Sequence, residues 1–395
     1  MGRSIIITHS SQSANSRLLR LTLILFVLSS WLPACNQVSA PITTVTWTTT
    51  PSKTVTFTRT PTDTLSPTSS ITASPSATST RTRTSTASPT PAPLELFTTR
   101  VLRAGIQSQT YLDDQCSYLQ MRWSAEGSQP GTVVVPIMFH SIVQNGTQLA
   151  DPNKDITADQ FTAFVTYARH LGFETITTQE LLGFLLGNAS IPPRSMMIIV
   201  DDRRPGLIRE WLMPVLEEYE WTVTSAYIAD PGSLKWAWDL MDQLNSSGRM
   251  DVQSHGYTGQ LYIVPETPVD QIQNEIWNST PVLEEHFGAR PIAFIWPGGN
   301  FTPLSVMVAR LGGYELGFTA FSRGPLMFDW IPSGDEERAV NDPLMVLPRA
   351  WSSAANVNLD EAVKVSEQAV AFAEENYQTE SDWYSTYCGG QLTNR

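Results

Sequence analysis

The feature that most constrains this chain is a regular alternation of strand-like and helix-like segments between residues 131 and 352. Short runs such as TVVVPIM (132–138) and MMIIV (196–200) have the β-branched, apolar composition of buried strands. Between them, apolar residues such as Phe161 and Phe164 recur at the spacing of one helical face. Strands that alternate with helices form parallel sheets with helical crossovers. We therefore predict one α/β domain, with a barrel-like (β/α) architecture, over 131–352.

The predicted elements cover this region almost continuously. Strands are expected at 132–138, 174–177, 196–200, 223–228, 251–254, 292–296 and 315–319. Helices are expected between Thr157 and Gly172, and at 178–186, 207–219, 236–246, 269–287 and 303–311. Thr178 is the expected N-cap of the second helix, because a threonine side chain can accept a hydrogen bond from the free N–H groups of the first turn.

Several polar residues fall where predicted strands end. Parallel sheets and barrels carry their chemistry at the carboxyl ends of their strands, so this location is informative. Taken singly, a histidine at a strand end or an Asp-Asp pair is more often structural than functional. Taken together, they predict one site, whose candidate residues are His140, Asp201, Asp202, His255, Trp296, Pro297, Gly298 and Arg349.

In these residues the chain resembles the NodB-homology polysaccharide deacetylases, carbohydrate esterases that remove acetyl groups from glycans. The resemblance covers roughly 134–350. PIMFHSI (136–142) is similar to the opening motif of the family, and Met196–Asp202 to its apolar strand that ends in Asp-Asp. Ser254-His255 is similar to the start of the Ser-His-Thr-x-x-His motif, and Leu347–Arg349 to the closing Leu-Pro-Arg. The opening histidine places the chain nearest the poly-N-acetylglucosamine deacetylase branch.

The resemblance implies a NodB-type barrel-like domain and a role for each polar residue. Asp201 would be the general base, and His140 the general acid. Asp202 and His255 would be ligands of one divalent metal, usually zinc. Such a metal polarises the acetyl carbonyl and lowers the pKa of its bound water, while the base and the acid move protons.

Two further strand ends complete the expected site. Arg349 is expected to pair with a carboxylate and to orient it. Trp296 is the tryptophan assigned to sugar stacking, because it ends a strand beside the expected pocket, with Pro297 and Gly298 next to it. Most of the other tryptophans are expected to pack in the core or at its rim.

One position departs from the pattern of the family. Its second metal-binding histidine lies four residues after the first, and here that position is Gly259. Arg203 and Arg204 follow the Asp pair, and these cations are expected to lower the pKa of the neighbouring base and to compete with a metal. Catalytic zinc typically keeps three protein ligands, so we expect weak metal binding unless Gln260, Tyr257 or a water molecule completes the set. The function expected is metal-dependent deacetylation in attenuated form. The alternatives are a catalytically inactive glycan-binding protein of the same fold and an unrelated surface protein.

The first 35 residues have the pattern of an export signal. Arg17 and Arg20 precede LTLILFVL (21–28), an apolar run of signal-peptide length that is short for a membrane span. The run leads into Leu-Pro-Ala-Cys35, which resembles the lipobox of bacterial lipoproteins, where the cysteine is acylated. An ordinary cleaved signal and an uncleaved anchor are the alternatives. Each of them places the remainder of the chain outside the cytoplasm.

A linker is predicted over 36–95. This segment is rich in Thr, Ser and Pro and has few apolar side chains whose burial could offset the entropy of ordering it, so we expect it to be disordered. The net charge of the whole chain is −13, which argues against nucleic acid as a partner, because phosphate binding needs a basic surface. The expected partners are therefore a polysaccharide or peptidoglycan and, through the lipid anchor, a membrane.

Two segments flank the predicted domain. The first is 96–130, and the second is 353–395, which contains an amphipathic helix over 359–377. Cys116 and Cys388 lie one in each flank. Export from the cytoplasm permits a disulfide between them, and two free thiols are the alternative.

Overall fold

A parallel sheet forms the centre of the fold, as the alternation of strands and helices predicts. The computed structural model describes residues 93–230, 232 and 234–392. In this part of the chain, seven strands follow the order β10-β9-β8-β7-β6-β2-β12, and an eighth, β5, pairs with β6. The expected export signal with Cys35, and the linker as far as residue 92, lie outside the described residues.

The strands of this sheet are short, and all of their pairings are parallel. Their bounds are β2 Val133–Phe139, β5 Glu174–Thr175, β6 Arg194–Val200, β7 Val223–Tyr227, β8 Met250–Ser254, β9 Ala293–Ile295, β10 Leu316–Phe318 and β12 Ala350–Trp351. Two small sheets that the sequence patterns did not predict pair β1 (Gln107–Gln109) with β11 (Ile331–Ser333) and β3 (Ser141–Val143) with β4 (Asp155–Thr157).

The two central strands β2 and β6 are buried on both faces. Val133 and Phe139 belong to one hydrophobic cluster, and Val134, which points to the opposite face, belongs to another. This double burial explains why the strands read as continuous apolar runs rather than as alternating patterns. Their register pairs Phe139 with Val200. The residues that follow, His140 and Asp201, therefore leave the sheet side by side.

The helices largely follow the prediction. Their bounds are α2 Ala158–His170, α3 Thr178–Gly187, α6 Lys235–Asn245, α7 Val269–Trp277, α8 Ser279–Phe287, α9 Pro303–Leu311 and α10 Asp335–Val340. The helix expected at 207–219 begins earlier, as α4 (Pro205–Leu207), and passes through a π-helical turn (Ile208–Leu212) into α5 (Met213–Tyr219). The single helix expected at 269–287 is two helices, α7 and α8, separated at Asn278.

Helix capping explains where the first two of these helices begin. Thr157 caps α2 in a capping box. The N-cap of α3 is Thr177, whose side chain accepts from the backbone of Glu180, so the expectation of Thr178 was wrong by one residue. Thr178 is instead a buried first-turn residue whose backbone N–H and hydroxyl donate to the carboxylate of Asp251.

The segment 347–351 connects the two edges of the curled sheet. Leu347 donates its backbone N–H to the carbonyl of Gly317 at 2.7 Å and accepts from the N–H of Thr319 at 2.9 Å, so it lies beside β10. Three residues later the chain forms β12, which pairs with β2. The first and last parts of the sheet are thus joined by one short segment, which gives the domain its barrel-like form.

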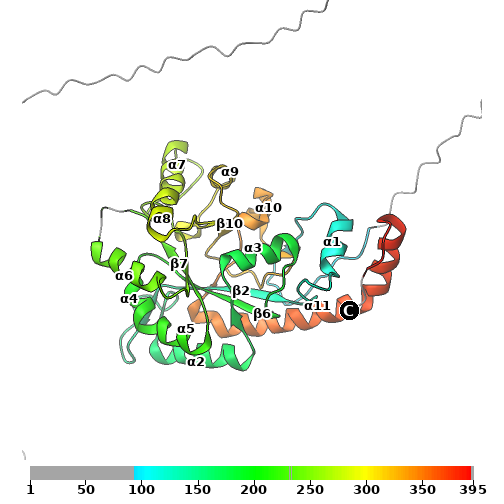
Figure 1. Ribbon diagram of the computed structural model, residues 1–395, viewed down its shortest axis with the longest axis horizontal. Coiled ribbons are helices and arrows are strands. Elements are labelled where there is room, and N and C mark those ends of the chain that lie inside the picture. Colours follow the sequence, from blue (N-terminus) through cyan, green and yellow to red (C-terminus); the bar gives the residue numbers. More distant parts are fainter. Residues whose placement is uncertain (1–92, 231, 233, 393–395) are drawn as a thin grey trace, which may run out of the picture. The chain divides into compact units, whose positions relative to one another are not determined.

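The two flanking segments pack together outside the sheet. Figure 1 shows α11 (Ala355–Tyr387), in orange to red, running beneath β2 and β6 toward α1 (Gln115–Arg122). A disulfide joins Cys116 to Cys388, as expected, with the two Cα atoms 5.7 Å apart. Within the described residues, none of the helices has the length and apolar character needed to cross a membrane.

Candidate functional site

Asp201 lies at the centre of the first group of predicted residues. It follows β6, and its side chain is almost completely buried. One carboxylate oxygen, Oδ1, accepts a hydrogen bond from Nη1 of Arg349 at 2.5 Å. The other oxygen, Oδ2, lies 3.5 Å from Nε2 of His140. The structure therefore brings together three of the predicted residues, from the ends of β2 and β6 and from the closing segment.

The charges of this group act on one another. Burial alone would raise the pKa of Asp201, but the positive charge of Arg349 outweighs burial and holds that pKa below its usual range. The pKa of His140 is also lowered, mainly because the ring is buried. Near neutral pH, Asp201 is therefore ionised and His140 is neutral.

Arg349 is fixed from two sides. Its side chain is 1% exposed, and its Nε donates to the backbone carbonyl of Thr319 at 2.7 Å, just after β10. A buried guanidinium needs a partner for its charge, and Asp201 provides it. Arg349 thus contacts the predicted base itself.

Asp202 belongs to a second group, which faces the predicted metal position. Its backbone has a positive φ of 67°, an uncommon conformation for a residue with a side chain. Its Oδ1 lies 3.7 Å from Nε2 of His255. The other ring nitrogen of His255, Nδ1, lies 2.9 Å from the carbonyl of Ile295 and must carry the proton, since a carbonyl only accepts. Nε2 is therefore the ring nitrogen that faces the carboxylate of Asp202.

The residues present do not form a three-ligand metal centre. Asp202 and His255 supply two donors, and the family pattern would place the third at Gly259. Gly259 has φ +67°, and a Cβ atom built there would lie 2.5 Å from the side chain of Ile228. Within the described residues, no cluster of three or more His, Cys, Asp and Glu side chains could hold a metal ion. Catalytic zinc typically has three protein ligands, so the donors here do not fit it.

Glu275 of α7 holds the loop that carries Gly259. Its buried carboxylate accepts from the backbone N–H of Gly259 at 2.7 Å, and from the backbone N–H and the hydroxyl of Thr258. A Cβ atom at Gly256 would collide with the same carboxylate, at 2.3 Å. The loop after β8 is thus bound to α7 where the family pattern would place a second imidazole.

The two arginines after the Asp pair have different environments. Arg203 donates to the carbonyls of Ile228 and Asp230, and its guanidinium packs over the rings of Tyr227 and Trp238. It therefore stabilises the structure beside the site.

Arg204, in contrast, lies at the site. Its Nη2 and Nε donate to Oδ2 of Asp202 at 2.9 and 3.3 Å, and its Nη1 donates to the hydroxyl of Ser141 at 3.2 Å. The expectation was that both arginines would lower the pKa of the neighbouring base, but the pKa of Asp201 is lowered mainly by Arg349. The carboxylate of Asp202 lies between a guanidinium and an imidazole.

Trp296 does not have the predicted role. Its side chain is 0% exposed, its indole N–H donates to the carbonyl of Met345 at 2.8 Å, and its ring packs edge-on against Phe294. A buried ring cannot stack on a sugar, so the prediction of Trp296 as a substrate-binding residue was wrong. Pro297 is also buried, whereas Gly298 is exposed and lies against the ring of Tyr262.

Trp351 is an aromatic residue at the site that the sequence analysis missed. It ends β12, is half-buried, and its ring centre lies 5.5 Å from that of His140. It follows Arg349 by two residues, and that position next to the closing motif was the one signal that could have identified it. Tyr262, which is 65% exposed, is a second accessible ring near the loop after β9.

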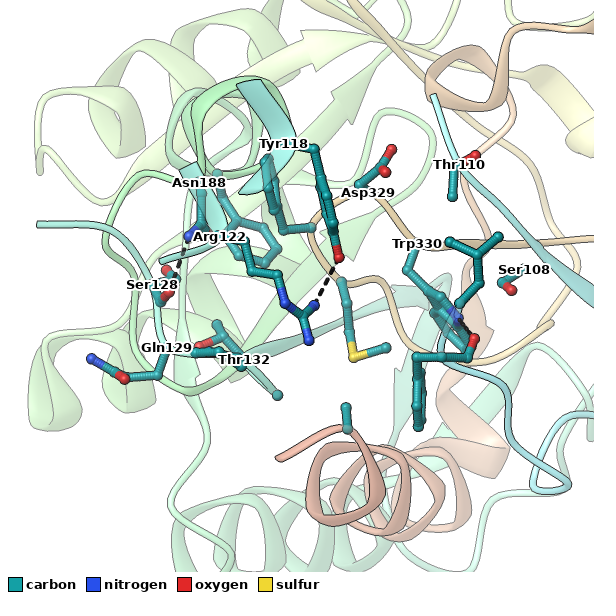
Figure 2. A pocket seen from close by; sticks show the side chains of 18 residues that line it. Ser108, Thr110, Tyr118, Arg122, Ser128, Gln129, Thr132, Asn188, Asp329 and Trp330 are labelled. Atoms are coloured by element: carbon teal, nitrogen blue, oxygen red, sulfur yellow. Dashed lines mark hydrogen bonds between the residues drawn. The ribbon is translucent and has the colours of Figure 1, made fainter. Parts of the chain in front are cut away.

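A separate cavity lies at the opposite end of β2. Figure 2 shows Tyr118 and Arg122 on one side of it and Trp330 on the other. Its free space of about 60 Å³ holds only a few water molecules. The cavity also contains Asp329, whose pKa burial raises to about 6. The residues of the Asp201 and Asp202 groups do not line this cavity.

One protein family matches part of the sequence. Residues 189–317 match the family model described as polysaccharide deacetylase, a segment that contains Asp201, Asp202 and His255. No curated protein sequence matches the chain significantly.

Several solved structures are similar to the chain. The deacetylase PplD of Streptococcus pyogenes, in complex with acetate, is 18% identical over 60% of this chain and 99% of that one, with a TM-score of 0.48. IcaB from Ammonifex degensii is 19% identical over 62% and 98%, with a TM-score of 0.46. The polysaccharide deacetylase BC0361 from Bacillus cereus is 17% identical over 58% and 69%, with a TM-score of 0.46.

Proposed function

We propose that this chain, which carries a polysaccharide deacetylase domain of the NodB type, binds an acetylated polysaccharide or peptidoglycan of the cell envelope and hydrolyses it only in attenuated form. The site would be the carboxyl-end face of the sheet, where His140, Asp201 and Asp202 lie. One observation carries the proposal. Asp202 and His255 are the two metal donors of the family pattern that remain, and at the third position, Gly259, a side chain would need a strained positive φ and would displace Ile228.

The retained residues indicate what chemistry the site can still perform. Asp201 is ionised because the positive charge of Arg349 stabilises its carboxylate. That carboxylate can therefore accept a proton from a group bound above it. The neutral ring of His140 lies beside the same carboxylate and offers a second position for a proton. The donors do not form a three-ligand centre, so they do not fit a divalent metal such as zinc.

Metal-dependent deacetylation at a full rate is the second candidate function. The group formed by His140, Asp201 and Arg349 favours it, since this arrangement places a base and an acid side by side. The two candidate functions differ in one requirement. Deacetylation at a full rate needs a tightly bound metal, and therefore a third ligand, whereas the attenuated function does not.

Acetate release and glycan binding, measured on the same protein, distinguish the two functions. We expect the full chain to bind N-acetylglucosamine oligomers or peptidoglycan fragments in calorimetry. We expect its release of acetate to be close to that of Asp201→Asn, which serves as the matched control. Rapid acetate release that is lost in Asp201→Asn and on addition of a chelator would support the second candidate and contradict the first.

The location proposed is the outer surface of a cell membrane, with the chain anchored through acylated Cys35. The support is the sequence pattern that ends in Leu-Pro-Ala-Cys. We expect labelled palmitate to be incorporated into the wild-type chain and not into Cys35→Ala. Labelling that persists in Cys35→Ala would exclude a lipid anchor at this residue.

A further inference from the structure

Arg204 is held in place beside the acid that would bind a metal. Three of its N–H groups point to protein acceptors, two to Oδ2 of Asp202 and one to the hydroxyl of Ser141. Residue 205, which follows it, is a proline that begins α4 and restricts the backbone at this point. The side chain of Arg204 is nevertheless 37% exposed. The guanidinium is therefore both fixed and accessible.

This guanidinium still has hydrogen-bonding capacity. An arginine carries five N–H donors in one plane, and the three contacts to Asp202 and Ser141 account for three of them. One N–H on each terminal nitrogen remains, and the exposure of the side chain lets an acceptor approach from solvent. Hydrogen bonds from a charged donor are stronger than those between neutral groups. A carbonyl oxygen bound at the site would therefore find a charged donor next to Asp202.

In a metal-dependent site of this family pattern, the metal cation would lie beside Asp202, close to the position of Arg204. There, the positive charge beside Asp202 would polarise the carbonyl of an acetyl group. In this chain the charge in contact with Oδ2 of Asp202 is that of Arg204. We infer that Arg204 replaces the metal in binding the acetyl carbonyl. Its guanidinium donates to the carbonyl oxygen of the acetamido group of an N-acetylated sugar, and this recognition requires no metal. The inference rests on the proposed glycan-binding function and adds the residue that selects the acetylated form.

The contact implies a selectivity that can be measured. An acetamido group offers a carbonyl oxygen, whereas the free amine of a deacetylated sugar carries a positive charge and no acceptor. Arg204 would attract the first and repel the second. We therefore expect the chain to bind N-acetylglucosamine oligomers more tightly than glucosamine oligomers of equal length. The preference should persist in a chelator such as EDTA.

The test is calorimetry of the full chain with both oligomers, with EDTA present throughout. Arg204→Gln should weaken binding of the acetylated oligomer about tenfold or more, which corresponds to the loss of one charged hydrogen bond of about 1.4 kcal/mol. It should also reduce the preference for acetylation. Arg204→Lys keeps the charge and loses the planar guanidinium, so its affinity for the acetylated oligomer should lie between those of wild type and Arg204→Gln. Arg209→Gln removes the same charge from an exposed position further along the same helical segment, so it is the matched control and should bind as wild type.

The possible outcomes distinguish failure of this inference from failure of the proposed function. Acetyl-selective binding in EDTA that falls in Arg204→Gln supports the inference. Binding that Arg204→Gln leaves unchanged, or that EDTA abolishes and zinc restores, overturns the inference while the glycan-binding function stands. A wild-type chain that binds no oligomer overturns both. Loss of affinity in Arg204→Gln for both oligomers equally would show a structural effect and would also count against the inference.

Discussion

Single residues decide whether this site can hold a metal, and Gly259 is the clearest example. Its φ of +67° is a conformation that side chains rarely adopt, and Ile228 occupies the space that a Cβ atom would need. Both facts are invisible in the sequence, which shows only that a histidine is replaced by glycine. Restoring the histidine therefore meets an obstacle that a sequence comparison would not reveal.

We predict that Gly259→His does not restore tight zinc binding. The added side chain should destabilise the domain by roughly 1–3 kcal/mol, because it combines backbone strain with a steric overlap. Chemical denaturation and zinc calorimetry would measure the two effects.

Gly146→His is the control for this prediction. Gly146 also has a positive φ, of 82°, but no heavy atom of the described residues lies within 4 Å of the position that its Cβ would take. Gly146→His should therefore show the destabilisation that comes from backbone strain, without the part that comes from steric overlap. Stoichiometric, tight zinc binding by Gly259→His would contradict the prediction.

Asp329 makes stability depend on pH in a predictable direction. Burial is the main cause of its raised pKa of about 6, so the folded chain binds this proton more tightly than the unfolded chain does. The sign follows from linkage. Between the unfolded pKa near 4 and the folded pKa near 6, the folded state holds more protons, and stability falls as pH rises. Above pH 6 the ionised carboxyl costs about 3 kcal/mol, and this cost disappears below pH 4.

Asp329→Asn should remove this dependence. The amide oxygen can still accept from the backbone N–H groups of Tyr111 and Leu112, which now bond to the carboxylate. The variant should therefore be more stable than wild type at pH 8, and its advantage should vanish toward pH 4, as measured by urea denaturation. Glu126→Gln, at an exposed position, is the control. A constant difference from pH 4 to pH 8 would contradict the assignment.

At the scale of single residues, sequence reasoning worked where position along a strand was sufficient. His140 and Asp201 end predicted strands, and the register of β2 and β6 places them side by side. It failed for Trp296, because burial of that ring depends on Met345, a residue 49 positions later whose carbonyl binds the indole. A strand-end position alone does not distinguish a ring that faces solvent from one that packs under a neighbouring segment.

Elements show the same division between local and distant causes. The start of α2 could be predicted because a capping threonine and an apolar face are local features. The break between α7 and α8 at Asn278 also has a local cause, Pro281 in the first turn of α8, which has no N–H to donate to the carbonyl of Trp277. It was missed because the apolar pattern continues across the break. The pairs β3–β4 and β1–β11 consist of three-residue strands, too short for a pattern of alternation to be recognised.

The loop between β8 and α7 depends on the buried carboxylate of Glu275. We predict that Glu275→Gln destabilises the domain by about 1–3 kcal/mol, because it weakens charged hydrogen bonds to Thr258 and Gly259 while preserving the shape of the side chain. Hydrogen exchange at the amides of Thr258 and Gly259 should accelerate. Glu284→Gln on α8, where the side chain is 50% exposed, should have little effect. Unchanged exchange at both amides would show that the loop is held by other contacts.

At the scale of the whole molecule, the disulfide between Cys116 and Cys388 closes a loop of 272 residues. Replacing both cysteines by serine should lower the free energy of unfolding by about 2–4 kcal/mol, because the unfolded chain gains freedom. Reducing the wild-type protein should produce a loss of similar size and should not affect the double variant. Equal stability of the oxidised and reduced wild type would mean that the contacts between α1 and α11 hold the flanks without the covalent bond.

The alternation of strands and helices was enough to predict a parallel sheet with helical crossovers, because it repeats along most of the domain. The way the sheet is closed could not be predicted. The closing segment contains only the two-residue strand β12, and its partner β2 lies more than 200 positions earlier in the chain. Neither the length nor the composition of that segment indicates which strand it will meet.

The closing segment also determines when the site can form during synthesis. Asp201 is made 148 residues before Arg349, the side chain that neutralises it in the folded domain. At typical rates of translation, the ribosome adds these residues in on the order of 10 s. During that time Asp201 must stay in contact with water, since burying a carboxylate without its counter-charge is unfavourable. The carboxyl end of β6 therefore belongs to the last part of the nascent chain to become compact, and premature termination before residue 349 yields a sheet whose central acid lacks its arginine.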